Sequence, residues 1–129
     1  MGSIYRDKWP VTKNIDKVFL KSENDLNRDI ALVKMRSQVT FSSSIRPIAL
    51  PSENQLMAIY TGETLIASGF GTMANGKMAD VLQYTYMRGI SVEECRSIYI
   101  NDIDFNLLCT RGYPRSDQSI CFGDGGGAL

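Results

Sequence analysis

The residues of this chain that could do covalent or metal chemistry are three cysteines and the acidic side chains, because its 129 residues contain no histidine. The imidazole roles of proton shuttle and metal ligand are therefore excluded within this sequence. Cys95, Cys109 and Cys121 are spaced too widely for a CxxC metal or redox pair, and a closed zinc site would lack ligands. We expect no metal and no cofactor. The odd cysteine count leaves one thiol without a partner.

A second candidate is the glycine-rich stretch Gly123-Asp124-Gly125-Gly126-Gly127-Ala128-Leu129. Glycine has more backbone freedom to lose on folding than other residues, so we expect a turn here to be loose. Taken alone, it is equally consistent with a flexible end.

Composition limits the function classes. The chain has formal net charge zero and 43% hydrophobic residues, which is typical of a globular protein of at most one ordinary domain. Nucleic acid and membrane surfaces are poor partners for a chain without excess charge of one sign. The longest uncharged apolar run, around Thr64 to Gly71, is too short to cross a bilayer. No basic segment followed by an apolar one lies near Met1, so the sequence as written predicts no signal peptide.

The elements that must position these groups are mostly strands. Ser91-Val92-Glu93-Glu94 has the spacing of a capping box and predicts a short helix towards Tyr99. Asn75-Gly76 predicts a tight hairpin turn, and the polar, proline-marked segment 42–52 predicts a link between two halves. Short stretches rich in apolar or β-branched residues predict strands at 15–20, 29–35, 64–70, 81–90 and 106–110. This pattern predicts an all-β barrel or sandwich.

Five stretches, in the right order, resemble the chymotrypsin-like serine protease family. Asn27 to Lys34 (NRDIALVK) resembles the NDIALIK strand, and Pro47 to Pro51 (PIALP) resembles the PIxLP segment between the two halves. Ser68 to Gly71 (SGFG) resembles SGWG, and Val81 to Tyr84 with Glu94-Cys95 resembles the VLQ strand and its following helix and cysteine. The terminal GDGGGAL resembles the GDSGGPL nucleophile motif. The style is most similar to arthropod chymotrypsins and their inactive paralogues.

The resemblance implies a partial double antiparallel β-barrel with one short intermediate helix. We expect residues 15–46 to be a remnant of the first barrel, 47–63 to be the interdomain crossing, and 64–129 to be an incomplete second barrel. Before Ile15 we expect no counterpart of the family's new N-terminus (IVGG), of its TAAHC segment with the catalytic histidine, or of most of the first barrel. Strands such as 29–35 and 81–90 would then lack a partner on at least one side, so we expect a truncated domain without a stable, uniquely packed fold.

The same resemblance assigns the site residues. Asp29 matches the triad aspartate, whereas Gly125 stands at the position of the nucleophilic serine and no histidine is present. The backbone N–H groups of Gly123 and Gly125 match the oxyanion hole, to which a glycine still donates. Ser119 matches the base of the primary specificity pocket, where a serine is typical of members that prefer large apolar side chains.

The cysteines and Asp124 follow by the same comparison. Cys95 and Cys109 match a pair that the family links around the intermediate helix, and the partner of Cys121 would lie beyond Leu129. In active members the residue at Asp124 pairs with a freed N-terminal ammonium, so we expect a buried Asp124 to be an uncompensated charge.

Three functions remain. The first is a catalytically inactive homologue, extracellular by family resemblance, that acts as a binding or decoy module for protein or peptide ligands. The second is a partial product of a protease gene without a function of its own. The third, an active serine endopeptidase, conflicts with the missing nucleophile and base.

Overall fold

The computed structural model describes residues 1–20, 30–56, 58–99 and 107–129. Most regular structure in these ranges is strand, as the all-β prediction requires. Two compact units are present: unit 1 contains Met1–Ser3 and Lys8–Ala49, and unit 2 contains Ile4–Asp7 and Leu50–Leu129. The expected strand 29–35 begins at Ala31, and Asp29 lies outside the described residues.

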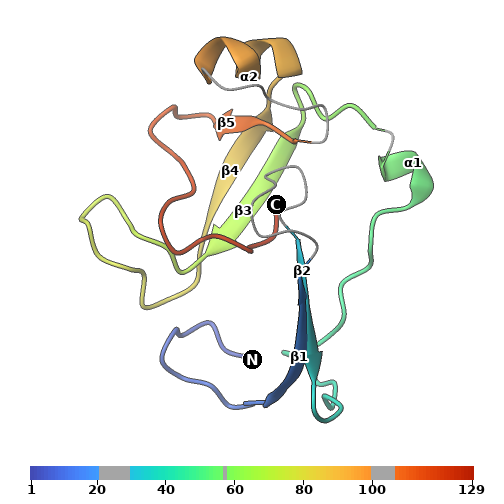
Figure 1. Ribbon diagram of the computed structural model, residues 1–129. Helices are drawn as coiled ribbons and strands as arrows, with labels where there is room; N and C mark the ends of the chain where they lie inside the picture. Colours follow the sequence, from blue (N-terminus) through green and yellow to red (C-terminus); the bar gives the residue numbers. More distant parts are fainter. Residues whose placement is uncertain (21–29, 57, 100–106) are drawn as a thin grey trace. The chain divides into compact units, whose positions relative to one another are not determined.

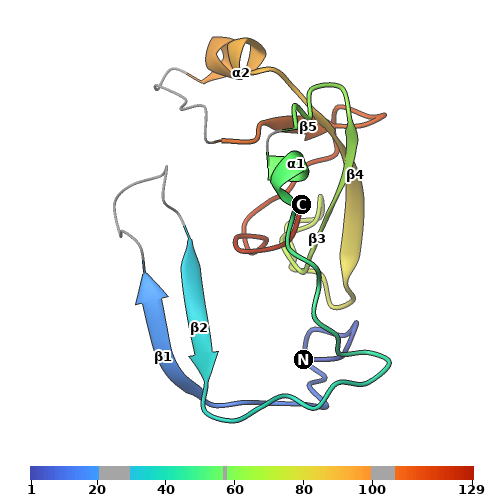
Figure 2. The same cartoon turned by 90° about the vertical axis from the view of Figure 1, so that its right-hand side faces the viewer.

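Unit 1 is built on an antiparallel ribbon of two strands, β1 (Ile15–Leu20) and β2 (Ala31–Met35), shown side by side in Figure 2. Lys17 is opposite Lys34, Val18 opposite Val33 and Phe19 opposite Leu32, and the register shifts between Ile15 and Lys17. None of the described residues of this unit is buried. The ribbon is therefore held mainly by its own ladder, which is marginal for two strands in water.

Unit 2 contains a three-stranded antiparallel sheet in the order β3–β4–β5 (Figure 1). Its strands are β3 (Thr64–Gly69), β4 (Gln83–Gly89) and β5 (Thr110–Gly112). The expectation that the strand around 81–90 lacks a partner on one side is wrong, because β3 pairs with one edge of β4 and β5 with part of the other. The sheet alternates as a half-buried sheet should: Ala67 and Met87 are buried, whereas Ile66 and Tyr86 are exposed.

Helix α2 (Val92–Ile98) follows β4 at one end of the sheet (Figure 1). It begins as predicted, because the Ser91 hydroxyl accepts a hydrogen bond from the Glu94 N–H at 3.1 Å. Cys95 on this helix is fully buried and is disulfide-bonded to Cys109. Met87, Ile90 and the disulfide therefore make the core of this end of the unit.

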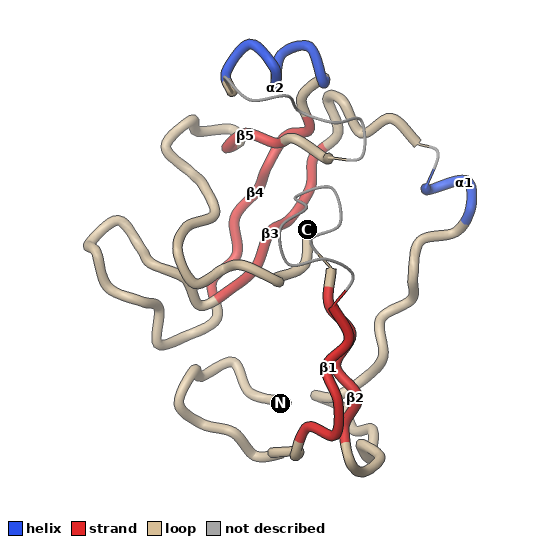
Figure 3. Tube along the Cα trace, viewed as in Figure 1, coloured by secondary structure: helices blue, strands red, loops and turns tan. Residues whose placement is uncertain are grey.

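Two elements differ from the prediction (Figure 3). Strand β5 lies at Thr110–Gly112 instead of 106–110, and residues 107–109 are not strand. The expected crossing segment contains a one-turn helix, α1 (Glu53–Leu56). The Ser52 backbone N–H donates to the Gln55 side-chain oxygen at 2.9 Å, while the Ser52 hydroxyl accepts from the Gln55 N–H at 3.4 Å. This reciprocal pair is a capping box.

No helix among the described residues has both the length and the apolar composition needed to cross a membrane.

Candidate functional site

The glycine-rich segment at the C-terminus forms two successive turns. The Asp124 N–H donates to the Cys121 carbonyl at 3.0 Å, and the Gly127 N–H donates to the Asp124 carbonyl at 2.9 Å. Gly123 and Gly126 have φ values of 95° and 80°, a region that side-chain-bearing residues rarely adopt. The stretch forms a defined turn, and its backbone conformation explains why glycine is suited to positions 123 and 126.

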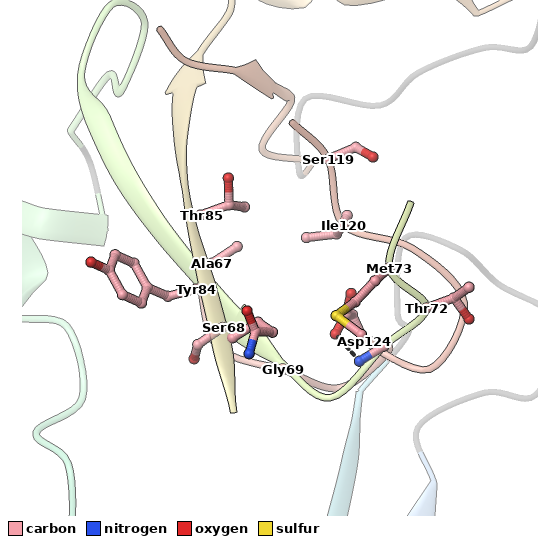
Figure 4. Close-up of a pocket in the computed structure, with 12 residues that line it drawn as sticks. Ala67, Ser68, Gly69, Thr72, Met73, Tyr84, Thr85, Ser119, Ile120 and Asp124 are labelled. Carbon is pink, nitrogen blue, oxygen red and sulfur yellow. Dashed lines mark hydrogen bonds between the residues drawn. The ribbon is translucent and has the colours of Figure 1, made fainter. Parts of the chain in front are cut away.

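The Asp124 carboxylate fastens this turn to the segment that follows β3. One carboxylate oxygen accepts a hydrogen bond from the Gly71 N–H at 2.8 Å, and the other accepts from the Cys121 N–H at 3.0 Å. Figure 4 shows Asp124 beside Gly69 and Thr72. Asp124 is half-buried, so the full burial on which the expected uncompensated charge depended is not present, and two backbone N–H groups satisfy its carboxylate.

Two glycines on the facing segment make room for this carboxylate. A Cβ atom added at Gly69 or at Gly71 would overlap the Asp124 side chain. A second attachment lies next to it, where the Phe122 carbonyl accepts from the Thr72 N–H at 2.8 Å and from its hydroxyl at 3.2 Å. Sequence reasoning used the SGFG stretch only as a family marker and missed its contact with Asp124.

Gly125 is the position matched to the nucleophile. An added Cβ atom there would meet nothing within 4 Å, and its φ lies outside the positive region. The position is therefore open towards solvent and could hold a side chain, but glycine presents none. Within the described part of the chain, neither the Gly123 nor the Gly125 N–H donates a hydrogen bond to another group.

A pocket lies between the sheet and the C-terminal segment (Figure 4). Ala67 and Thr85 line it from the strands, and Ser119, Ile120 and Asp124 line it from the C-terminal side. The Thr85 hydroxyl is buried and has no hydrogen-bond partner among the described residues. Ser119, predicted as the base of a specificity pocket, is exposed on this wall, and the structure places it in the same pocket as Asp124.

Cys95 and Cys109 do not line this pocket. The predicted Cys95–Cys109 disulfide is present, with Cα atoms 6.1 Å apart, and it joins the buried face of α2 to the residue before β5. Cys121 is a free, exposed thiol. In the described residues no group of three or more His, Cys, Asp or Glu side chains could hold a metal ion.

Comparison with known proteins shows the family to which this chain belongs. The family model described as Trypsin matches residues 5–129, nearly the whole chain. The chain belongs to the trypsin family. The match begins at residue 5, ahead of the Ile15 at which the motif resemblance begins. The short segment 4–7 lies in unit 2, where the Ile4 carbonyl accepts from the Leu82 N–H at 2.7 Å.

Individual relatives carry protease names. The chain is 32% identical to Trypsin-1 of Astacus astacus over 121 residues, which is 92% of this chain and 50% of the relative. It is 38% identical to Trypsin II-P29 of Gallus gallus over 106 residues, covering 81% of this chain and 41% of the relative. A venom protease of Bombus pensylvanicus is 33% identical over 103 residues, covering 78% and 42%. The chain thus spans about half the length of these trypsin-family relatives.

Proposed function

We propose that this chain is a non-catalytic member of the trypsin family that acts extracellularly as a binding module for protein or peptide ligands. The observation that carries the proposal is Gly125. Acyl transfer in this family requires a side-chain nucleophile activated by a base. Gly125 presents no nucleophile, and the chain contains no histidine to serve as the base.

The architecture of the turn supports a retained scaffold. Asp124 is bonded to two backbone N–H groups, and the glycines that accommodate it are in place. A surface that keeps its shape while it lacks the reacting atom is suited to binding without turnover. The disulfide favours an oxidising compartment, as expected of an extracellular protein.

The test is a comparison of the unmodified chain with Gly125→Ser and with an active trypsin-family enzyme. We expect neither form of this chain to hydrolyse chymotrypsin-type peptide substrates or to be labelled by a fluorophosphonate probe. The serine fits without a clash, so its failure would reflect the missing base and not a disturbed turn. Turnover by the purified unmodified chain, or labelling of Gly125→Ser at residue 125, would contradict the proposal.

A further inference from the structure

The side chain of Met78 packs against the turn that contains Gly123. A Cβ atom added at Gly123 would lie 2.9 Å from the Met78 methyl carbon and 3.3 Å from the Gly71 Cα atom. The Met78 methyl group therefore already fills the space that a side chain at position 123 would take, and it confines the Gly123 backbone on this side. All three residues belong to unit 2.

The hairpin segment that carries Met78 is also bonded to this turn. Met78 is paired with Thr72 in an isolated β-bridge, and the Thr72 N–H and hydroxyl both donate to the Phe122 carbonyl. The Gly71 N–H donates to the Asp124 carboxylate at 2.8 Å. Because Met78 is opposite one of these donors and in contact with the turn itself, a displacement of its side chain acts on the segment that holds the turn.

The described methionines of unit 2 differ in their access to solvent. Met78 is 40% exposed and Met73 is 38% exposed, whereas Met87 is 3% exposed and belongs to the core. A dissolved oxidant can therefore reach the first two side chains but not the third. Met73 lines the pocket beside Asp124, whereas Met78 packs on Gly123.

We propose that Met78 is an oxidation site, and that its conversion to the sulfoxide by hydrogen peroxide loosens the turn that contains Gly123. The thioether sulfur takes one oxygen atom from the peroxide: the O–O bond breaks, an S–O bond forms, and the other oxygen leaves as water. Sulfur is oxidised by two electrons and the peroxide is reduced by two. No bond of the methionine side chain is broken.

The sulfoxide fits the turn less well than the thioether. Oxidation converts a flexible apolar side chain into a polar, chiral one. A polar group loses free energy when it is held against apolar atoms without a hydrogen bond, so the oxidised side chain moves towards water. The methyl contact with Gly123 is then lost, and the hydrogen bonds from Gly71 and Thr72 must hold the turn without it.

A looser turn is a regulation of the proposed binding site, so any effect on a protein ligand rests on the proposed function. The oxidation and the loosening are both measured without a ligand. Their failure is therefore distinct from the failure of the proposed function, which is read from turnover and probe labelling.

The test treats the full chain carrying Cys121→Ser with hydrogen peroxide, because the exposed Cys121 thiol would otherwise be oxidised as well. Peptide mass spectrometry measures the gain of oxygen at each methionine, and hydrogen exchange followed by NMR measures the order of the turn. We expect Met78 to be oxidised and Met87 to remain unmodified. Oxidation should speed exchange of the Gly71 and Thr72 amides at least about threefold, because their acceptors lie in the turn. Reduction by the two epimer-specific methionine sulfoxide reductases should restore slow exchange.

Two variants in the same background assign the effect to one sulfur atom. Met78→Leu keeps an apolar side chain without sulfur, so peroxide should leave the exchange of its Gly71 and Thr72 amides unchanged. Met73→Leu is the matched change at similar exposure in the same hairpin; it retains Met78 and should respond to peroxide as the background does. The amides of β4 report general damage and should exchange at the same rate before and after oxidation.

Four results would overturn the proposal. Met78 that stays unmodified while Met73 is oxidised would show that the Met78 sulfur is shielded. Complete oxidation of Met78 with unchanged exchange would show that the turn does not depend on this contact. A response that persists in Met78→Leu would assign the effect to another residue. Slower exchange after oxidation would show that the sulfoxide oxygen accepts a hydrogen bond from the turn and tightens it.

Discussion

At the scale of single residues, the position of Asp124 depends on two positions that have no side chain. Gly69 and Gly71 leave the space that its carboxylate occupies, and the Gly71 N–H is one of its two donors. The Asp124 side chain therefore fits only because Gly69 and Gly71 have no side chains. At Gly125 a side chain would meet no other atom, but glycine has none.

We expect Gly71→Ala to destabilise unit 2 by about 1–3 kcal/mol, the usual cost of forcing a methyl group into filled space. Gly125→Ala is the matched control and should change stability by less than about 1 kcal/mol, because the added methyl group meets nothing. Urea unfolding of both variants, followed by tyrosine near-ultraviolet circular dichroism, measures the difference. Equal stability of the two variants would show that the Asp124 carboxylate is not confined by Gly71.

The three thiols give a second prediction at this scale. Without reduction, iodoacetamide should modify Cys121 alone, since Cys95 and Cys109 are joined and Cys95 is fully buried. Peptide mass spectrometry after alkylation checks this, with Cys121→Ser as the unmodified control. Modification of Cys95 or Cys109 in the unreduced chain, or a bridge that involves Cys121, would contradict the disulfide assignment.

At the scale of elements, the first residue of α2 could be predicted from the capping residue that precedes it. The Ser91 hydroxyl caps the helix, and the pKa of Glu93 lies below its ordinary value because its own backbone N–H and the Ser91 hydroxyl donate to its carboxylate. Because the pKa of Glu93 is lowered, its ionised carboxylate stabilises the folded state at pH values above the ordinary glutamate pKa. This stabilisation is lost as the pH falls through the lowered pKa.

Ser91→Ala should therefore destabilise unit 2 by about 1 kcal/mol and raise the pKa of Glu93 towards its ordinary value. Denaturant unfolding measures the first effect, and an NMR titration of the Glu93 side chain measures the second. Ser97→Ala, on the same helix but outside the cap, should leave the pKa of Glu93 unchanged. A pKa of Glu93 that stays low in Ser91→Ala would remove the hydroxyl as a cause.

Elements with local signals were predictable from the sequence, and elements without them were not. The cap at Ser91 predicted α2, and the apolar and β-branched residues of 64–70 and 81–90 predicted β3 and β4 to within two residues at each end. Apolar Leu107 and Leu108 misplaced the last strand, because the register with Met87, Arg88 and Gly89 selects Thr110–Gly112 instead. Helix α1 was missed although Ser52 and Gln55 have capping-box spacing, since one turn gives too short a periodic pattern.

Some residues of the candidate site could be predicted from the sequence, whereas the contacts of Asp124 could not. A family motif led to Gly125, whereas the positive φ of Gly123 and Gly126 was not predicted. The donors to Asp124 could not be predicted, because Gly71 lies 53 residues away in sequence and backbone groups carry no sequence signal. The prediction for Asp29 as triad aspartate stays a prediction, because that residue lies outside the described part.

At the scale of the whole molecule, the two units differ in how they are held together. Every buried apolar residue in the described ranges, and the disulfide, belongs to unit 2. Unit 1 depends on a two-stranded ribbon without a buried side chain in its described residues. The sequence-based expectation of an unstable chain therefore applies to unit 1 more directly than to unit 2.

We expect the units to unfold separately. The single tryptophan, Trp9, belongs to unit 1, whereas all six tyrosines belong to unit 2, so each unit has its own intrinsic probe. On heating, the tryptophan signal should change before the tyrosine signal, and amides of β4 should exchange more slowly than those of β2. One coincident transition with equal protection in both strands would show a single cooperative fold.

The two units carry opposite net charge, because unit 1 has eight basic and four acidic residues whereas unit 2 has six basic and ten acidic ones. An isoelectric point near 6.2 describes the sum and not either half. At neutral pH and low salt, the basic unit should adhere to a cation-exchange resin and the acidic unit to an anion-exchange resin. The same chain should thus be retained on both columns, and retention on each reports which unit remains accessible when a ligand is bound.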